Sequence, residues 1–217
     1  SFTDEEVKSI GRFLDENGIG LVGFSIMTGH FLQSIDLMRK LKKNSKKIKF
    51  IFGGVHPTIL PEECLTAGAD YAVMGDGEIP LRRLLAEEPV YKIAGLCYVD
   101  NGKPVVNPAD HENLIPLDKL PFPDYDFSDS YFLDKASVKQ LDIKTYRDRT
   151  TWAGEYYYLT TTRGCPYHCA YCCNVNRHSL RRNTVDRVIE ELNEVKENMP
   201  FICGINIQDD SFFMGSD

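Results

Sequence analysis

The sequence of 217 residues lacks the features that would place it in several common protein classes. No apolar run approaches the ~20 residues that a transmembrane helix needs, and no segment is typical of a signal peptide. Internal repeats and low-complexity tracts are missing, and so are a Walker loop, a Ser–His–Asp triad and a His-x-x-x-His zinc helix. We therefore expect neither a membrane span nor these nucleotide-hydrolysing, serine-nucleophile or zinc-protease chemistries.

Positive charge is also in short supply. The chain has 25 Lys and Arg against 32 Asp and Glu, a net charge of −7, so binding to the phosphates of nucleic acid is not expected. A composition of 42% hydrophobic and 26% charged residues is that of an ordinary globular protein of one or two domains. Seven cysteines, an odd number with three of them clustered, fit a reducing cytoplasm better than a disulfide framework.

The three clustered cysteines are Cys165, Cys169 and Cys172, at the spacing C-x3-C-x2-C directly after a β-rich run at 156–162. Thiolates are soft ligands that suit iron–sulfur clusters and zinc, and three on one loop can converge on one centre. A cubane cluster has four irons, so three thiolates leave one iron open for chemistry. A structural zinc site usually takes four ligands in two close pairs, and no second pair exists here. The spacing favours an iron–sulfur cluster, with zinc as the alternative.

At these residues the chain resembles the radical S-adenosylmethionine (SAM) superfamily, whose signature is C-x3-C-x-aromatic-C, with Tyr171 as the aromatic residue. The resemblance implies a [4Fe–4S] cluster whose free iron binds SAM, and Tyr171 against the adenine. It further implies reductive cleavage of SAM to a 5′-deoxyadenosyl radical that abstracts hydrogen from a small-molecule or peptide substrate. An external electron donor of the flavodoxin or ferredoxin type belongs to that chemistry.

Upstream of the cysteines, short apolar runs alternate with helical patterns. Strands are predicted at 19–26, 48–52 and 71–74, and helices at 3–18, 31–43, 61–67 and 79–86. This alternation predicts βαβ units and a parallel sheet, in which ligands bind beyond the carboxyl ends of the strands. Those ends carry Ser25, the pair Gly53-Gly54 and the run from Gly75 to Glu78.

This block resembles the cobalamin-binding domain that precedes the radical SAM barrel in one large subfamily. The family pattern pairs S-x-L after one strand with Gly-Gly after the next, and here Ser25-Ile26-Met27 precedes Gly53-Gly54. Glycine lets a backbone come close to a bulky ligand. The resemblance implies cobalamin contacts from Ser25, Met27, Gly53, Gly54, Gly75, Gly77 and Glu78. The family's D-x-H-x-x-G motif would fall before Ser1, so His56 is not taken as the cobalt ligand, and we expect a loop histidine bonded to backbone.

Farther along, apolar runs at 91–99 and 104–106 flank an Asn-Gly turn and predict a hairpin. A helix is predicted at 184–198 and a strand at 201–207. The helix should bury a stripe made of Val185, Val188, Ile189, Leu192 and Val195. The strand ends at Asp209 and Asp210, which resemble the subfamily's second barrel strand near the SAM pocket; an Asp that caps the next helix is the alternative.

The predicted fold class is α/β. A partial doubly wound, Rossmann-like cobalamin-binding domain without its N-terminal strands occupies 1–106, a proline-rich linker 107–150, and the start of a radical SAM β/α barrel, a partial TIM-type barrel, 151–217. Because both ends look cut, we expect a piece of an enzyme that is inactive alone.

The implied function is cobalamin-dependent radical SAM chemistry, with methyl transfer to an unactivated carbon or phosphorus as the first choice. Radical oxidation or ring formation, as in anaerobic tetrapyrrole biosynthesis, is a second enzymatic reading. A non-catalytic zinc or iron–sulfur module is the alternative of another class. No residue is assigned a catalytic role.

Overall fold

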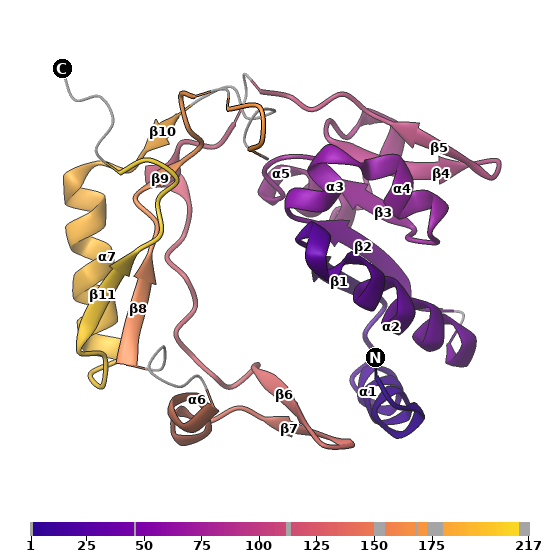
Figure 1. The fold of residues 1–217 in the computed structure, drawn as a ribbon, viewed down its shortest axis with the longest axis horizontal. Helices are drawn as coiled ribbons and strands as arrows, with labels where there is room; N and C mark the ends of the chain where they lie inside the picture. Colours follow the sequence, from indigo (N-terminus) through magenta and orange to yellow (C-terminus); the bar gives the residue numbers. More distant parts are fainter. Residues whose placement is uncertain are drawn as a thin grey trace. The chain divides into compact units, whose positions relative to one another are not determined.

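The structure, a computed structural model, describes residues 2–45, 47–111, 114–149, 155–167, 169–172 and 180–212. The chain divides into two units, which we describe separately (Figure 1). The first is Ser1–Leu114 with Leu133–Val138, and the second is Ile115–Phe132 with Lys139–Asp217. No helix within the described ranges is both long and apolar enough to cross a membrane.

The first unit is built on a five-stranded sheet in the order β1-β2-β3-β4-β5. Its strands are β1 Leu21–Ser25, β2 Lys49–Gly53, β3 Tyr71–Val73, β4 Leu96–Asp100 and β5 Lys103–Val106. Strands β1 to β3 run parallel, whereas β4 and β5 are antiparallel to their neighbours. In this register Ser25 lies opposite Gly53, so the predicted ligand-contact residues of these two strands meet at one edge. The predicted α/β class with a parallel sheet is confirmed.

Helices cover both faces of this sheet. They are α1 Asp4–Glu16, α2 Phe31–Asn44, α3 Val55–Ile59, α4 Pro61–Thr66 and α5 Glu78–Leu85, with 3-10 turns η1 Thr28–His30 and η2 Val90–Lys92. Helix α1 begins at the predicted capping box, in which the Thr3 hydroxyl accepts from the Glu6 amide and the Thr3 amide donates to the Glu6 carboxylate. Helix α3 is an addition, because the sequence predicted only a loop after Gly54.

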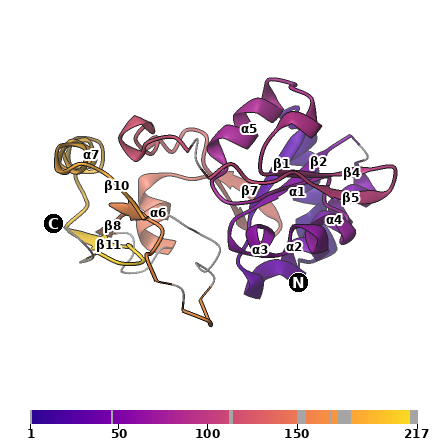
Figure 2. The ribbon, with the colours of Figure 1, turned by 90° about the horizontal axis from the view of Figure 1, so that it is seen from above.

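The alternation of side chains along the strands divides the core in two. Phe50 and Phe52 lie on the face that packs against α2, where Met38 is fully buried. Ile51 and Val73 lie on the opposite face. Figure 2 shows α5 on one side of the sheet and α2 to α4 on the other. Each large side chain buried here contributes roughly 1.5–3 kcal/mol to folding.

The predicted hairpin is present but its first strand begins later than expected. The turn residues Asn101 and Gly102 both have positive φ, 48° and 76°, as a type I′ turn requires. Strand β4 starts at Leu96, because the side-chain amide of Asn107 donates to the carbonyls of Val90 and Ile93 and holds that segment as the turn η2.

The described residues of the second unit form one β-α-β unit. Strand β8 Tyr156–Leu159 and strand β11 Gly204–Ile207 are parallel, with helix α7 Val185–Asn198 between them in sequence. The remaining elements after residue 115 are η3 Leu117–Lys119, β6 Tyr131–Asp134, β7 Ser137–Gln140, α6 Ile143–Arg149, β9 Thr162–Arg163 and β10 Arg181–Arg182. A β-α-β unit is the repeat from which β/α barrels are built.

The predicted core stripe of α7 is partly wrong. Val195 is buried as expected, but Val185 and Ile189 are 77% and 51% exposed. Glu191 is buried instead, because the Tyr157 hydroxyl donates to its carboxylate at 2.5 Å. A hydrogen-bonded carboxylate can occupy a core position that a purely apolar pattern would not assign to it.

Part of the predicted linker is attached to α7. The Asp118 carboxylate accepts from the backbone amide of Thr184, the N-cap of α7, at 2.8 Å. The guanidinium of Arg187 donates to the Leu120 carbonyl at 2.7 Å and lies over the Phe122 ring. These contacts attach the segment that follows Ile115 to the second unit. The predicted domain boundaries, at 106 and 150, stay a prediction.

Candidate functional site

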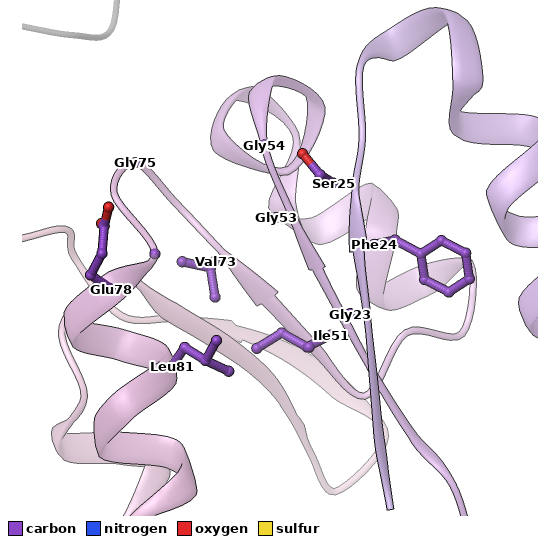
Figure 3. Close-up of a pocket in the computed structure, with 11 residues that line it drawn as sticks. Gly23, Phe24, Ser25, Ile51, Gly53, Gly54, Val73, Gly75, Glu78 and Leu81 are labelled. Carbon is purple, nitrogen blue, oxygen red and sulfur yellow. The ribbon is translucent and has the colours of Figure 1, made fainter. Parts of the chain in front are cut away.

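A cavity of about 500 Å³ lies at the carboxyl ends of β1, β2 and β3 (Figure 3). It is lined by Gly23, Phe24, Ser25, Ile51, Gly53, Gly54, Val73, Gly75, Gly77, Glu78 and Leu81. All the predicted cobalamin contacts except Met27 are in this lining. Met27 lies two residues beyond β1 and is 61% exposed. The volume is that of a typical small-molecule site.

The lining combines apolar side chains, bare backbone and two polar groups. Figure 3 shows Ile51 and Val73 from the sheet and Leu81 from α5 pointing toward one another. The polar side chains are those of Ser25, at the end of β1, and Glu78, at the start of α5. The Phe24 ring points away from this group, toward the phenylalanine core on the other face of the sheet. Such a lining suits a large, mostly apolar ligand that is oriented by a few polar contacts.

The two glycines of the Gly-Gly pair have different roles. A Cβ at Gly54 would lie 2.8 Å from the Ile26 amide nitrogen, and its φ of 98° already disfavours other residues. A Cβ at Gly53 would meet no atom within 4 Å, in space that opens on the cavity. The close approach of Ile26 by itself requires glycine at position 54, whereas position 53 has open space around it. A cobalamin contact of either glycine stays a prediction.

Hydrogen bonds fix the loops that surround the cavity. The Ile26 amide donates to the Gly53 carbonyl at 2.7 Å. The Thr58 hydroxyl donates to the Gly54 carbonyl at 2.7 Å and accepts from the Gly75 amide at 3.0 Å. Thr58 thereby ties the end of β2 to the end of β3. The sequence does not single out Thr58, although a Thr four residues after a helix-starting Gly is placed for such a bond.

His56 is buried rather than a loop histidine bonded to backbone, so that expectation is wrong. It belongs to α3, and its ring packs against the Phe31 ring in a tilted arrangement, with centroids 3.9 Å apart. Its Nδ1 lies 3.3 Å from the Thr28 hydroxyl, and its Nε2 lies 3.5 Å from the Glu63 carboxylate without hydrogen-bond geometry. The side chain is therefore part of the packing behind the cavity loops.

The cysteine loop is closed at its base. Thr162 and Arg163 of β9 pair with Arg182 and Arg181 of β10, so the loop leaves and returns at one two-stranded stem. Within the loop the Cys172 amide donates to the Cys169 carbonyl at 2.9 Å. His168 and Cys173 fall outside the described residues.

The three cysteine thiols stay accessible. Cys165 and Cys172 are half-buried, Cys169 is exposed, and Tyr171 is 93% exposed. Among the described residues, no three His, Cys, Asp or Glu side chains are grouped closely enough to hold a metal ion. The thiols are thus on one loop but not drawn together. Their chemistry, three soft donors on one short segment, fits an iron–sulfur cluster.

Two other cysteines are structural. Cys64 and Cys97 are fully buried in the core of the first unit. Burial raises the pKa of the Cys64 thiol to about 12 and that of the Cys97 thiol to about 11. Both thiols therefore stay protonated near neutral pH and are poor metal ligands.

The two predicted SAM-contact carboxylates differ in their surroundings. Asp209 is half-buried, and both of its oxygens accept hydrogen bonds from Thr161 and Thr162, at the start of the cysteine loop. Asp210 is exposed. A contact of either residue with SAM stays a prediction.

The chain is similar to known proteins in sequence and in fold. Residues 2–85 match the family model of the B12 binding domain. A curated relative is cytidylyl-2-hydroxyethylphosphonate methyltransferase of Streptomyces wedmorensis, which is 24% identical over 230 residues. That alignment covers 93% of this chain but 42% of the relative, so the chain spans less than half the relative's length.

Two solved structures of TsrM, a radical S-adenosylmethionine methyltransferase from Kitasatospora setae, share the fold. One has tryptophan substrate and the SAM analogue aza-SAM bound, with a TM-score of 0.65 at 16% identity over 94% of this chain and 39% of that one. The other has cobalamin and a [4Fe–4S] cluster bound, with a TM-score of 0.61 at 13% identity over 93% of this chain and 40% of that one. Residues 2–85 therefore match the B12 binding domain, in a chain that along most of its length is similar in sequence to a methyltransferase and shares its fold with TsrM.

Proposed function

We propose that this chain binds cobalamin at the cavity of its first unit and a [4Fe–4S] cluster through Cys165, Cys169 and Cys172, as part of a radical SAM methyltransferase. When bound, the cluster with SAM would supply the 5′-deoxyadenosyl radical, and cobalamin the methyl group. The observation that carries the proposal is the cavity, whose lining contains the predicted Ser25, Gly53, Gly75 and Glu78.

The chain's own residues shape the first site before any ligand arrives. Paired strand ends put Ser25 beside Gly53, and Thr58 fixes the Gly75 loop next to them. Bare glycine backbone on this edge allows a bulky ring system to lie close to the strand ends. Met27 follows Ser25 by two residues in the sequence and adds exposed apolar surface.

In the second unit the cysteine loop would hold the cluster, with three thiolates on three of its irons. Tyr171 is free to lie against a bound adenine, since its ring is 93% exposed. The β-α-β unit that contains this loop would be the start of a β/α barrel, in which active sites lie at the carboxyl ends of the strands. The loop does follow such an end, because β8 stops at Leu159.

Methyl transfer is preferred over radical oxidation or ring formation because the relatives named above are methyltransferases. Their named substrates, a cytidylyl phosphonate and tryptophan, are small molecules of unrelated structure. For this chain we therefore propose a small-molecule substrate without choosing one. Because the chemistry is reductive, an external electron donor is part of the proposal.

Titration of the chain with hydroxocobalamin, followed by its visible absorption, tests the first site. Gly53→Val adds a side chain to open space on the cavity, so we expect at least a tenfold weaker Kd with the fold unchanged. Gly20→Val is the matched control, because a Cβ at Gly20 also meets no atom within 4 Å but lies outside the lining. Gly54→Val should instead destabilise the fold itself, by forcing the contact with Ile26.

Absence of cobalamin binding by the wild-type chain would overturn this assignment. A Kd for cobalamin in Gly53→Val equal to that of the wild type would mean that cobalamin binds elsewhere than in this cavity.

A further inference from the structure

We propose that Asp209 is a positioning residue whose carboxylate fastens the base of the cysteine loop to the end of strand β11. Its Oδ1 accepts from the backbone amides of Thr161 and Thr162, at 2.7 and 2.9 Å. Its Oδ2 accepts from the Thr161 hydroxyl in a short hydrogen bond. Three bonds to one carboxylate, all on adjacent residues, form a single anchoring point.

The place of Asp209 follows from the strand pairing. Strands β8 and β11 are parallel and in register up to Leu159 and Ile207. The ladder continues for one more bond, because the Gln208 amide donates to the Leu159 carbonyl at 2.8 Å. Asp209 is the next residue, at the point where the backbone segments that follow β8 and β11 separate. Its side chain spans this gap and accepts a hydrogen bond from Thr161. It thus replaces the ladder at the point where backbone pairing ends.

The anchored residues are the start of the loop's stem. Thr162 pairs with Arg182 across the β9–β10 stem, and the Asn183 amide donates to the Thr161 carbonyl at 2.9 Å. Cys165 follows Thr162 by three residues. Fixing Thr161 and Thr162 therefore fixes both the departure of the chain toward the cysteines and the point to which it returns.

Hydrogen bonds to an ionised carboxylate are stronger than those between neutral groups, so this anchor is well suited to hold a loop in one orientation. Removing the Asp209 carboxylate, as in Asp209→Ala, would leave the two amides without this acceptor while the rest of β11 stayed paired. The role differs from the SAM contact that the sequence suggested, because the oxygens of the carboxylate are engaged by the protein itself. The consequence for a cluster rests on the proposed function; the anchor does not.

The anchor is tested in the metal-free chain by amide hydrogen exchange. In Asp209→Ala we expect the amides of Thr161 and Thr162 to exchange about tenfold faster, which corresponds to ~1.4 kcal/mol. The amide of Val195, in the core of α7, should be unchanged. Asp209→Asn keeps an oxygen for the two amides and should show a smaller increase.

The consequence for the cysteines is tested after anaerobic reconstitution with iron and sulfide. We expect the 400 nm-region absorption to be lost to a chelator several-fold faster in Asp209→Ala than in the wild type. Asp186→Asn is the control, because Asp186 is exposed on the first turn of α7. Thr161→Val, which removes the hydroxyl contact alone, should give an intermediate rate.

Unchanged exchange at Thr161 and Thr162 in Asp209→Ala would overturn the anchor. Equal acceleration at Val195 would show a general loss of the fold instead, and if Asp209→Ala does not fold, Asp209→Asn and Thr161→Val give the decision by the same readout. If Asp209→Ala exchanged the Thr161 and Thr162 amides faster but lost its cluster to the chelator at the wild-type rate, Asp209 would not position the cysteines. A wild type that takes up no iron–sulfur cluster would refute the proposed function while the exchange data still judged the anchor.

Discussion

The cavity of the first unit and the cysteine loop of the second are assembled in different ways. The cavity is shaped by the fold of the first unit, because strand register and the Thr58 hydroxyl bring Ser25, Gly53 and Gly75 together. The base of the loop is fixed by the β9–β10 stem and by Asp209. The residues Cys165, Cys169 and Cys172 are exposed or half-buried, and within the part of the chain that the structure describes they do not form a group that could hold a metal ion.

This difference reflects what each ligand must supply. A cavity lined by backbone and apolar side chains gains its shape from the same packing that stabilises the sheet. Thiolates repel one another and gain nothing by converging until a metal centre joins them, so metal binding completes such sites. We therefore expect the first site to be insensitive to iron and the second to depend on it.

The largest effect is expected from removing a cluster ligand. Alanine at Cys165, Cys169 or Cys172 should abolish most of the bound iron and sulfide after anaerobic reconstitution, because three thiolates are the minimum for a site-differentiated cluster. Cobalamin affinity should be unchanged in all three variants. Iron and sulfide analysis beside a cobalamin titration measures both.

Two further cysteines serve as controls for that series. Cys173→Ala and Cys203→Ala should keep the cluster, since neither residue is part of the C-x3-C-x2-C spacing. A loss in Cys173→Ala equal to that in Cys169→Ala would point to a four-cysteine site. Lowered cobalamin affinity in Cys169→Ala would break the distinction between the two sites.

The sequence predicted the first site better than the second because of how each is encoded. Alternating apolar runs determine parallel strands, and parallel strands necessarily bring their carboxyl ends to one edge, which placed Ser25 beside Gly53. The division of labour between Gly53 and Gly54 was not predictable. It depends on the close approach of Ile26, a contact across the sheet that no local pattern contains.

In the second unit the sequence motif identified the candidate cluster cysteines but not the contacts that fix the base of their loop. Asp209 lies 44 residues after Cys165, so its bonds to Thr161 and Thr162 depend on the register of β8 and β11. Glu191 shows the same limit. A prediction of the buried face of α7 from its apolar residues does not include Glu191. Its burial depends on a hydrogen bond from Tyr157, which is distant in the sequence.

A smaller effect, confined to the second unit, is expected from Tyr157→Phe. Burial raises the pKa of Tyr157, and so does its hydrogen bond to Glu191, so the phenol stays protonated as donor. The variant leaves a buried carboxylate short of a donor, at a cost of about 1–3 kcal/mol. Urea denaturation followed by circular dichroism should show this loss.

Tyr158→Phe is the matched control for Tyr157→Phe, because Tyr158 is 47% exposed on the neighbouring position of β8. It should change stability by less than about 0.5 kcal/mol. Cobalamin affinity should stay at the wild-type value in both variants. Equal losses of stability in the two would mean that the Glu191 contact contributes little.

The smallest effect tests the first unit at the sheet edge opposite the cavity. The Asp70 carboxylate accepts from the Phe50 amide at 2.9 Å and lies 2.7 Å from the Lys42 ammonium. Burial alone would raise the pKa of Asp70, but these hydrogen bonds and the positive charge outweigh it, and the pKa is lowered.

Asp70→Asn should therefore lower the free energy of unfolding by about 1 kcal/mol near neutral pH. The control is Asp15→Asn, at an exposed position, which should leave that free energy nearly unchanged. Because the folded pKa is the lower one, the wild type's advantage should be full above about pH 5 and fade as pH falls below the ordinary Asp value of about 3.9. Urea denaturation from pH 7 to pH 3 measures this, and an advantage that grew on acidification would contradict it.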